Sequence, residues 1–386
     1  MIPYGRQDIS EADIQTVVDV LRSDFLTQGP TVPLFEKKIN TYCNSKYTVA
    51  TNSATSALHI ACLSLGLGLG DRLWTSPNTF VASANCGLYC GAEVDFVDID
   101  SNTYNMSIEA LEEKLEVAEK ENKLPKIIIP VHFAGQSCDM KSVHRLSIKY
   151  GFKVIEDASH AIGGRYLGEM IGGCHYSDIT IFSFHPVKII TTGEGGVATT
   201  NDLELAEHMR RLRTHGITRD KDLMVGEVDG DWSYQQIELG YNYRMTDLQA
   251  ALGVSQLDRI NKFIKRRTEI RNVYDQMLSS LPVIKPWQDS DTESSFHLYP
   301  IQINVENDNL NRKIVFNKLR ESGIGVNIHY IPVFTQPFYR KLGFKKGDFP
   351  VAEKYYNNTI SLPIYPTLTN IQQGKVVSEL TKALAH

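Results

Sequence analysis

The chain has 386 residues, of which 42% are hydrophobic, and its formal net charge is −5. This length and hydrophobic content are enough for a large core and predict more than one domain. The slightly acidic balance creates no field that would gather nucleic acid or an anionic membrane, so we expect neither as a partner. No apolar run reaches the ~20 residues of a membrane span, and the first residues lack the pattern of a signal peptide.

The cysteine content indicates reduced thiols rather than a disulfide scaffold. The six cysteines are scattered over the chain and none forms a CxxC pair: Cys43, Cys62, Cys86, Cys90, Cys138 and Cys174. Cys86 and Cys90 could share a helix face, but no further His or Cys follows at ligand spacing. We therefore predict buried thiols, no metal site and a cytoplasmic location.

The first two hundred residues alternate between helical and strand patterns. Apolar residues spaced three and four apart predict helices over 10–24, 53–67, 79–91 and 139–151, with Ser10 as the first cap. Short apolar runs predict strands over 46–52, 72–77, 92–100, 126–133, 152–159 and 178–185. This alternation predicts a mainly parallel sheet covered by helices on both faces.

The remaining residues predict a second, smaller unit. Helices are expected over 204–216 and 246–281, the second long enough to connect two domains. A strand over 294–304, a helix over 312–323 and a strand over 325–333 follow, which is typical of an α+β unit. We therefore predict a large domain over 1–259 and a small C-terminal domain over 260–386. The glycines of GLGLGD (66–71) follow a helix instead of a strand, so they predict a helix stop rather than a dinucleotide site.

Polar groups follow several predicted strands at the edge where parallel sheets bind ligands. Ser53–Ser56 open a helix, where free N–H groups can bind a phosphate, although simple capping accounts for them equally well. Glu156 and Asp157 end an apolar strand, where a carboxylate must be paired, used in a site, or engaged in capping a turn. Lys188 is the only Lys or Arg between Arg165 and Arg210.

Lys188 lies in FSFHPVKIITTGEGG, between apolar residues and a glycine cluster. A lysine held in a poorly solvated pocket loses its proton readily and becomes nucleophilic, whereas most lysines extend their charge to solvent. A phosphate cradle, a carboxylate and a lone lysine at neighbouring strand ends match the needs of pyridoxal phosphate. Phe80 follows another strand and could cover the cofactor ring. His185 has no chemical assignment, and we expect it to pack.

The chain resembles the DegT/DnrJ/EryC1/StrS sugar aminotransferases through motifs that run nearly end to end. The motifs are LTQGP with Phe35-Glu36, NSATSAL, TFVASAN, VIEDASHAIGG, FSFHPVKIITTGEGG, RTHGI, LGYNYRMTDLQAALG and IHYIPVF. The resemblance implies the aspartate aminotransferase-like fold of type I pyridoxal phosphate enzymes. That fold has a large domain with a mainly parallel seven-stranded sheet between helices and a smaller C-terminal α+β domain.

The resemblance also implies roles for individual residues. Lys188 would form the Schiff base with pyridoxal phosphate, and Asp157 would contact the pyridinium nitrogen. The other implied cofactor contacts are Ala54, Thr55, Phe80, His160, Ser183 and, from the neighbouring subunit of a homodimer, Asn242. The implied substrate contacts are Tyr4, Phe25, Leu26, Thr27, Arg244, His329 and Tyr330. Arg6, Arg213, His215 and Arg219 are further candidates for binding the substrate's anionic groups.

Within the family, the chain is most similar to the transaminases of pseudaminic acid biosynthesis, through NSATSAL, ASHAIG, SFHPVKIITT and FHLYPI. This resemblance implies that L-glutamate, leaving as 2-oxoglutarate, aminates a UDP-linked 4-keto-6-deoxy-N-acetylhexosamine to UDP-4-amino-4,6-dideoxy-N-acetyl-β-L-altrosamine. Alternatives are an aminotransferase for a dTDP- or GDP-linked 4-keto or 3-keto sugar, a non-catalytic regulator that binds pyridoxal phosphate, and a structural protein. We expect no added DNA-binding segment in this chain, which argues against a regulator. A structural protein would leave the clustered site residues unexplained.

Overall fold

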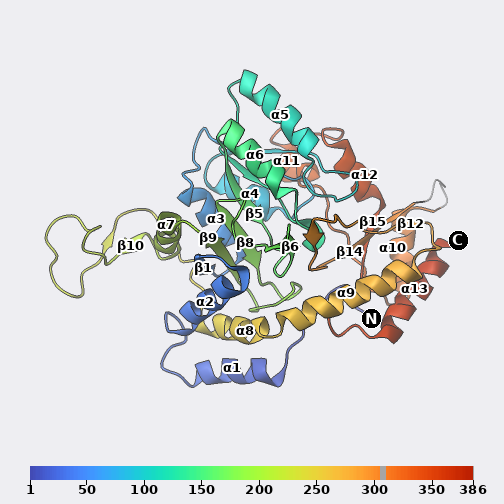
Figure 1. Ribbon diagram of the computed structural model, residues 1–386, viewed down its shortest axis with the longest axis horizontal. Coiled ribbons are helices and arrows are strands. Elements are labelled where there is room, and N and C mark those ends of the chain that lie inside the picture. Colours follow the sequence, from blue (N-terminus) through green and yellow to red (C-terminus); the bar gives the residue numbers. More distant parts are fainter. Residues whose placement is uncertain (305–309, 386) are drawn as a thin grey trace.

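The computed structural model describes residues 1–304 and 310–385, and a seven-stranded sheet lies at its centre (Figure 1). In spatial order the strands are β1 (Tyr47–Thr51), β9 (Gly196–Thr200), β8 (Ile179–Ser183), β5 (Lys153–Asp157), β4 (Ile127–Ile129), β2 (Arg72–Thr75) and β3 (Glu93–Phe96). Only β9 runs antiparallel to its neighbours, β1 and β8. The predicted mainly parallel sheet is confirmed, and β9 is the strand that the sequence pattern did not reveal.

Helices cover both faces of the sheet. Ile127 and Ile129 pack into a cluster with α3 (Ala54–Ser64), α4 (Ala82–Tyr89) and α7 (Leu203–Arg213), whereas Ile128 packs on the opposite face. The opposite face carries α5 (Ile108–Lys120) and α6 (Met140–Tyr150), and, nearer β1, α2 (Thr31–Cys43) and α8 (Asp247–Leu257). Because both faces of the sheet are buried, β4 consists of three consecutive isoleucines instead of alternating apolar and polar residues.

Capping side chains fix two helix starts that matter for the site. Ser53 accepts a hydrogen bond from the Ser56 N–H at the start of α3. Thr246 and Gln249 form a capping box at the start of α8. The predicted cap at Ser10 is confirmed, because Ser10 forms a capping box at the start of α1 (Glu11–Leu21).

The helix predicted over 246–281 is wrong in one respect: it is two helices. α8 ends at Leu257, and α9 (Ile260–Met277) begins after a break at Asp258 and Arg259. At the break, Arg259 has a ψ of 0° and its guanidinium bonds Asp13, a fully buried residue in the first turn of α1. The ion pair that attaches α1 to the body therefore coincides with the change of helix direction. α9 still connects the main sheet to the C-terminal part of the molecule (Figure 1).

The C-terminal elements form their own hydrophobic cluster, into which Ile2 also packs. The elements in this cluster are α9, β12 (Val283–Ile284), β14 (Tyr299–Ile303), α10 (Arg312–Glu321), β15 (Thr359–Leu362) and α13 (Asn370–Leu384). By contrast, α11 (Pro337–Arg340) and α12 (Pro350–Asn358) pack into the cluster of the main sheet through Tyr339, Ala352 and Tyr355. β12, β14 and β15 make a three-stranded antiparallel sheet. A separate short strand, β13 (Thr292–Glu293), joins β6 (Arg165–Tyr166) and β7 (Glu169–Met170). The division into domains 1–259 and 260–386 stays a prediction.

The strand predicted over 325–333 is wrong. Only an isolated bridge between Asn327 and Ser361 and another at Ile324 occur there, followed by a short 3-10 turn over Val333–Thr335. The Tyr330 N–H bonds the side-chain oxygen of Asn78 at 3.2 Å instead of a neighbouring strand. Pro332 has no N–H to donate, so this segment cannot continue a ladder.

An arm projects away from the body between α7 and α8, on the left of Figure 1. It is held by the short strands β10 (Ile217–Thr218) and β11 (Gln235–Gln236). Large apolar side chains along it are exposed, including Val225, Trp232 and Leu239. Within the described residues, no helix is both long and apolar enough to cross a membrane.

Candidate active site

A cavity of about 800 Å³ opens at the carboxyl ends of β1, β5 and β8. The predicted site residues that line it are Tyr4, Ala54, Thr55, Phe80, Asp157, His160, Ser183, Lys188, His329 and Tyr330. They come from six stretches of chain that the sheet and the C-terminal part bring together. The rule that ligands bind beyond the carboxyl ends of parallel strands therefore located this cavity correctly.

Lys188 lies in the turn that follows β8 and extends into the cavity. Its main-chain N–H bonds the carbonyl of His185 at 2.9 Å. Its amine has no hydrogen bond or ion pair to any residue in 1–304 or 310–385. Burial lowers the pKa of Lys188 to about 8, and the nearby charge of Asp157 opposes this shift only in part. The lysine is therefore much closer to its neutral, nucleophilic form at physiological pH than an ordinary lysine.

Asp157 is the last residue of β5 and is 5% exposed. One carboxylate oxygen accepts a hydrogen bond from the Ser83 hydroxyl at 2.6 Å, and the other accepts from the Ser159 N–H at 3.1 Å. These two donors orient the carboxylate without neutralising it. A buried negative charge facing the cavity is therefore available to a cationic group of a ligand.

The start of α3 forms an anion cradle beside Lys188. Ser53 satisfies the Ser56 N–H, but the N–H groups of Ala54 and Thr55 have no acceptor among the described residues and both residues line the cavity. An added Cβ on Gly196 would lie 2.4 Å from the Ala54 nitrogen, so only glycine lets β9 approach the helix start this closely. Free N–H groups and the helix dipole together favour a phosphate at this position.

Three histidines surround the lysine, and all are uncharged. Burial lowers the pKa of His160 and of His297 well below the ordinary value, and that of His329 to about 3, with the Lys188 charge adding to the effect. Nδ1 of His160 accepts a hydrogen bond from the Ala134 N–H at 3.3 Å, so its Nε2–H donates to the Tyr330 hydroxyl at 2.9 Å. Of these four basic residues, Lys188 is therefore the one whose pKa lies near physiological pH.

Aromatic rings form the wall of the cavity on the side of the C-terminal part. Tyr330 lies with its ring centroid 6.5 Å from that of Phe80, and Tyr4 lies 5.3 Å from His329. Phe80 is 59% exposed, so its ring face is free to cover a planar ligand.

A sequence profile of the DegT/DnrJ/EryC1/StrS aminotransferase family matches residues 7–381. The chain belongs to this family. It is 40% identical over 379 residues to the spore coat polysaccharide biosynthesis protein SpsC of Bacillus subtilis, covering 97% of this chain and 95% of SpsC. It is 37% identical over 382 residues to the UDP-4-amino-4,6-dideoxy-N-acetyl-beta-L-altrosamine transaminase of Campylobacter jejuni, covering 98% of this chain and 96% of that protein.

Solved structures of this aminotransferase family share the whole fold. Helicobacter pylori PseC, an aminotransferase involved in pseudaminic acid biosynthesis, is 30% identical with a TM-score of 0.91, covering 100% of this chain and 99% of PseC. Spr1654 of Streptococcus pneumoniae is 30% identical in its PMP form, with a TM-score of 0.90 and the same coverage, and it is also known with PLP. The fold is that of type I pyridoxal phosphate enzymes, and pyridoxal phosphate is the cofactor of this chain. The orphan N–H groups of α3, the Asp157 carboxylate and the unpaired amine of Lys188 fit its phosphate, ring nitrogen and aldehyde.

Five residues predicted for the site do not line this cavity: Phe25, Leu26, Thr27, Asn242 and Arg244. Phe25 and Leu26 are about half exposed, and the Leu26 carbonyl accepts from the Asp247 N–H. Asn242 is exposed, and Arg244 bridges to Thr51 at the end of β1. The cofactor and substrate roles of these five residues stay predictions.

Other candidate cations are already engaged or lie away from the cavity. Arg213 donates to the Glu36 carboxylate and the Ala50 carbonyl, both at 2.7 Å, so its charge is used to hold β1. Arg219 lies over the Tyr234 ring in the arm. His185 does not pack in the core as expected: it is exposed at the cavity rim.

Sequence reasoning missed several residues of the cavity. Ser83 lies beside the cavity and orients Asp157; it belongs to the motif TFVASAN, in which only Phe80 was assigned a role. His297 lines the cavity with its ring 4.5 Å from that of His160, and its Nδ1 has no partner among the described residues. The motif FHLYPI contained His297, so the histidine beside an apolar strand was the available signal. Asn327 lies in the segment that was expected to be a strand.

Proposed function

We propose that this aminotransferase transfers the amino group of L-glutamate to C4 of a UDP-linked 4-keto-6-deoxy-N-acetylhexosamine. The product would be UDP-4-amino-4,6-dideoxy-N-acetyl-β-L-altrosamine, with 2-oxoglutarate as the co-product. The observation that carries the proposal is the unpaired, partly buried amine of Lys188 beside Asp157 and the α3 cradle. The similarity to the Campylobacter and Helicobacter enzymes supports this nucleotide sugar.

Bound pyridoxal phosphate supplies a carbonyl that exchanges amino groups and a ring that accepts electrons. The chain contributes the binding and proton-handling groups. The Ala54 and Thr55 N–H groups and the Ser183 hydroxyl would bind its phosphate, and Asp157 would hold a proton on its ring nitrogen by charge attraction. Phe80 would cover one ring face, because its own ring is exposed at the cavity.

Lys188 would also move the proton at the reacting carbon. A pKa near 8 lets its amine accept a proton as a general base and return it as a general acid at physiological pH. The neutral His160, His297 and His329 supply no competing acid of comparable strength. Tyr4, His329 and Tyr330 would then orient the sugar at the cavity wall.

We further propose that the active unit is a homodimer with shared sites. Asn242 is exposed in this chain, and the arm beside it presents unpartnered apolar side chains such as Trp232 and Leu239. In the dimer, Asn242 would reach the cofactor phosphate of the neighbouring subunit, and Arg244 would bind an anionic group of the substrate. Mixing inactive Lys188→Ala and Asn242→Ala chains tests this: each hybrid dimer has one intact site of two and should regain about one half of the wild-type activity. Chains that regain no activity on mixing, in samples shown to form hybrids, would contradict shared sites.

An amination assay over a panel of nucleotide sugars tests the substrate. Purified enzyme, pyridoxal phosphate and L-glutamate are incubated with UDP-, dTDP- and GDP-linked 4-keto and 3-keto sugars, and NMR identifies the amine position and ring configuration of each product. We expect the highest kcat/KM for the UDP-linked 4-keto-6-deoxy-N-acetylhexosamine. A higher kcat/KM for a dTDP- or GDP-linked sugar would replace the substrate and keep the chemistry, whereas binding without any amination would favour a regulator.

A further inference from the structure

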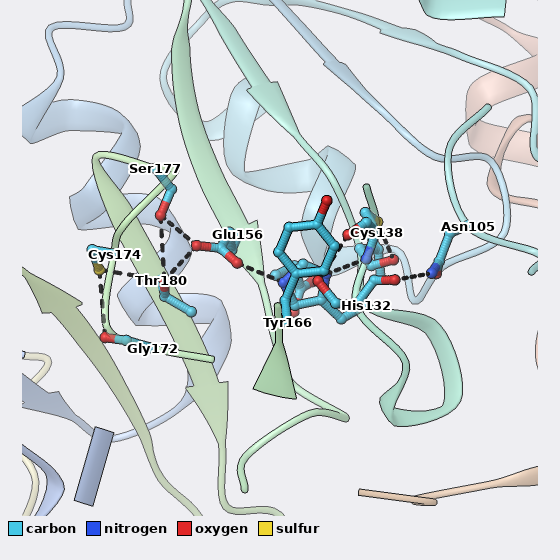
Figure 2. A network of polar contacts seen from close by, with 12 residues as sticks. Asn105, His132, Cys138, Glu156, Tyr166, Gly172, Cys174, Ser177 and Thr180 are labelled. Carbon is cyan, nitrogen blue, oxygen red and sulfur yellow. Dashed lines mark hydrogen bonds and ion pairs between the residues drawn. The ribbon is translucent and has the colours of Figure 1, made fainter. Parts of the chain in front are cut away.

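Behind the cavity, on the opposite face of β5, lies a buried polar network centred on Glu156 (Figure 2). Glu156 is 5% exposed and accepts hydrogen bonds from His132 Nε2–H at 2.6 Å, from Thr180 at 3.0 Å and from the Ser177 hydroxyl. Burial opposes its charge, but the hydrogen bond from His132 and those from the hydroxyls outweigh this and lower the pKa of Glu156. The carboxylate is therefore ionised and fully satisfied, although it faces away from the cavity.

His132 connects this carboxylate to the turn over 131–138. Its Nδ1 accepts a hydrogen bond from the Cys138 N–H at 3.1 Å, across the turn (Figure 2). Burial opposes a charge on His132, whereas its contacts with Cys138 and Glu156 raise its pKa to about 10. Because the Cys138 N–H points at Nδ1, that nitrogen must act as an acceptor and the ring carries its proton on Nε2, a tautomer that the ionised Glu156 favours by accepting from Nε2–H. Asn105 anchors the same turn from outside by accepting from the Phe133 N–H and donating to the carbonyls of Gln136 and Ser137.

The 131–138 turn also contacts two groups of the cavity. At its start, Val131 pairs with Asp157: the Asp157 N–H bonds the carbonyl of the preceding Pro130 at 2.9 Å, and the His132 N–H bonds the Asp157 carbonyl at 3.0 Å. Ala134, held in the left-handed region with a φ of 58°, donates its N–H to Nδ1 of His160. A single turn therefore fixes where Asp157 lies and which nitrogen of His160 carries the proton.

We propose that His132 and Glu156 are positioning residues for the active site, acting through the 131–138 turn on Asp157 and His160. Glu156 selects the tautomer of His132, His132 closes the turn through Cys138, and the turn fixes the His160 tautomer that donates to Tyr330. The link to the cofactor rests on the proposed function, whereas the link to the tautomer of His160 is a property of the protein alone.

Two substitutions at one position separate positioning from stability. In His132→Gln the amide can still donate to Glu156 but cannot reach the Cys138 N–H, whereas in His132→Asn the shorter side chain can accept from Cys138 and leaves Glu156 without its partner. Because an unpaired buried charge is costly, His132→Asn should be the less stable variant. If His132 positions the site through the turn, the tautomer of His160 should nevertheless be disturbed more in His132→Gln than in His132→Asn.

The test uses histidine 15N NMR on the cofactor-free protein, with the His160 signal assigned from His160→Gln. We expect wild type and His132→Asn to show one His160 tautomer with the proton on Nε2, and His132→Gln to show a mixture. Equilibrium dialysis should give a Kd for pyridoxal phosphate about tenfold higher in His132→Gln and within about twofold of wild type in His132→Asn. In Glu156→Gln the amide nitrogen can donate to Nε2 of His132 and so move the ring proton to Nδ1. This variant should therefore give intermediate changes in the His160 signal and in the Kd.

Asp13→Asn is the matched control, because Asp13 is an equally buried carboxylate in an ion pair with Arg259 and lies outside the cavity. It should lower the melting temperature and leave the His160 signal and the Kd unchanged. The proposal is overturned if His132→Gln and Glu156→Gln keep the wild-type His160 signal, or if His132→Asn loses the tautomer as fully as His132→Gln. A wild type that binds pyridoxal phosphate but aminates no sugar would refute the proposed function and leave the NMR result standing.

Discussion

Glu156 and Asp157 are neighbours on β5, but their carboxylates lie in different surroundings. Glu156 faces a closed network in which a histidine and two hydroxyls satisfy it (Figure 2). Asp157 faces an open cavity, oriented by Ser83 and Ser159 but paired with no cation at ion-pair distance in the described part of the chain. Successive residues of a strand point to opposite faces, so one step along the chain separates a structural acid from a chemical one.

This difference shows how the active site can be recognised in the fold. Buried side-chain atoms without a partner also occur in the body, for example Arg267 Nε and Gln373 Oε1, but around the cavity several unpaired groups face one shared space. The Lys188 amine, the Ala54 and Thr55 N–H groups and His297 Nδ1 all lack a partner within residues 1–304 and 310–385. Incomplete groups of complementary charge around one space indicate a ligand that supplies the missing partners.

The largest expected effect is at Lys188. Lys188→Ala should lower the rate of amination by at least about 10³-fold, because it removes both the cofactor attachment and the proton-transfer group. Product formation measured by chromatography at saturating pyridoxal phosphate gives the rate. Lys262→Ala, at an exposed lysine of α9, is the control and should keep the wild-type rate. A Lys188→Ala enzyme within tenfold of wild type would remove the lysine from the chemistry.

Substitutions at the two acids test this comparison directly. Asp157→Asn should lower kcat on the order of 10²-fold, because the charge that stabilises the cationic ring is lost, while the melting temperature changes little. Glu156→Gln should do the opposite, costing about 2 kcal/mol of unfolding free energy with kcat within about threefold of wild type at saturating cofactor. Urea unfolding and steady-state kinetics on both variants measure the two effects. Equal losses of kcat in the two variants would erase the distinction drawn above.

A smaller effect concerns stability and pH. The pKa of Lys188 is about 8 in the folded protein and 10.5 in the unfolded chain. The buried charge therefore lowers the free energy of unfolding of the cofactor-free protein, and this loss is complete below pH 8. Between these values the unfolded chain holds more protons, so wild-type stability should rise with pH relative to Lys188→Met. The variant's advantage, roughly 3 kcal/mol at pH 7, should therefore shrink through that window. Denaturant unfolding from pH 6.5 to 10.5 measures it, and a constant difference would mean that the pKa is not lowered.

Much of this arrangement could be predicted from local patterns. Helix and strand periodicity predicted six of the seven sheet strands, and the strand-end rule then brought Ala54, Asp157 and Lys188 to one edge. Those inferences succeed because a parallel sheet covered on both faces leaves few alternative arrangements. β9 was missed because it reads as GVATT, a strand of five residues whose first residue, Gly196, belongs to the glycine cluster after Lys188.

The features that could not be predicted depend on contacts between distant residues. The break between α8 and α9 accompanies the pairing of Arg259 with Asp13, 246 positions away. The segment over 325–333 loses its strand because Tyr330 bonds Asn78, and His297 enters the cavity only when the C-terminal part closes over the sheet. The tautomers of His132 and His160 are set by N–H groups of a turn, which leave no trace in residue type.

The most direct test of the account is to identify the residue that holds the cofactor. The enzyme is loaded with pyridoxal phosphate, treated with sodium borohydride to fix the attachment as a stable secondary amine, digested and analysed by mass spectrometry. We predict one pyridoxyl phosphate per chain, on Lys188. Attachment to another lysine, or no attachment in a protein that binds the cofactor, would contradict the central claim.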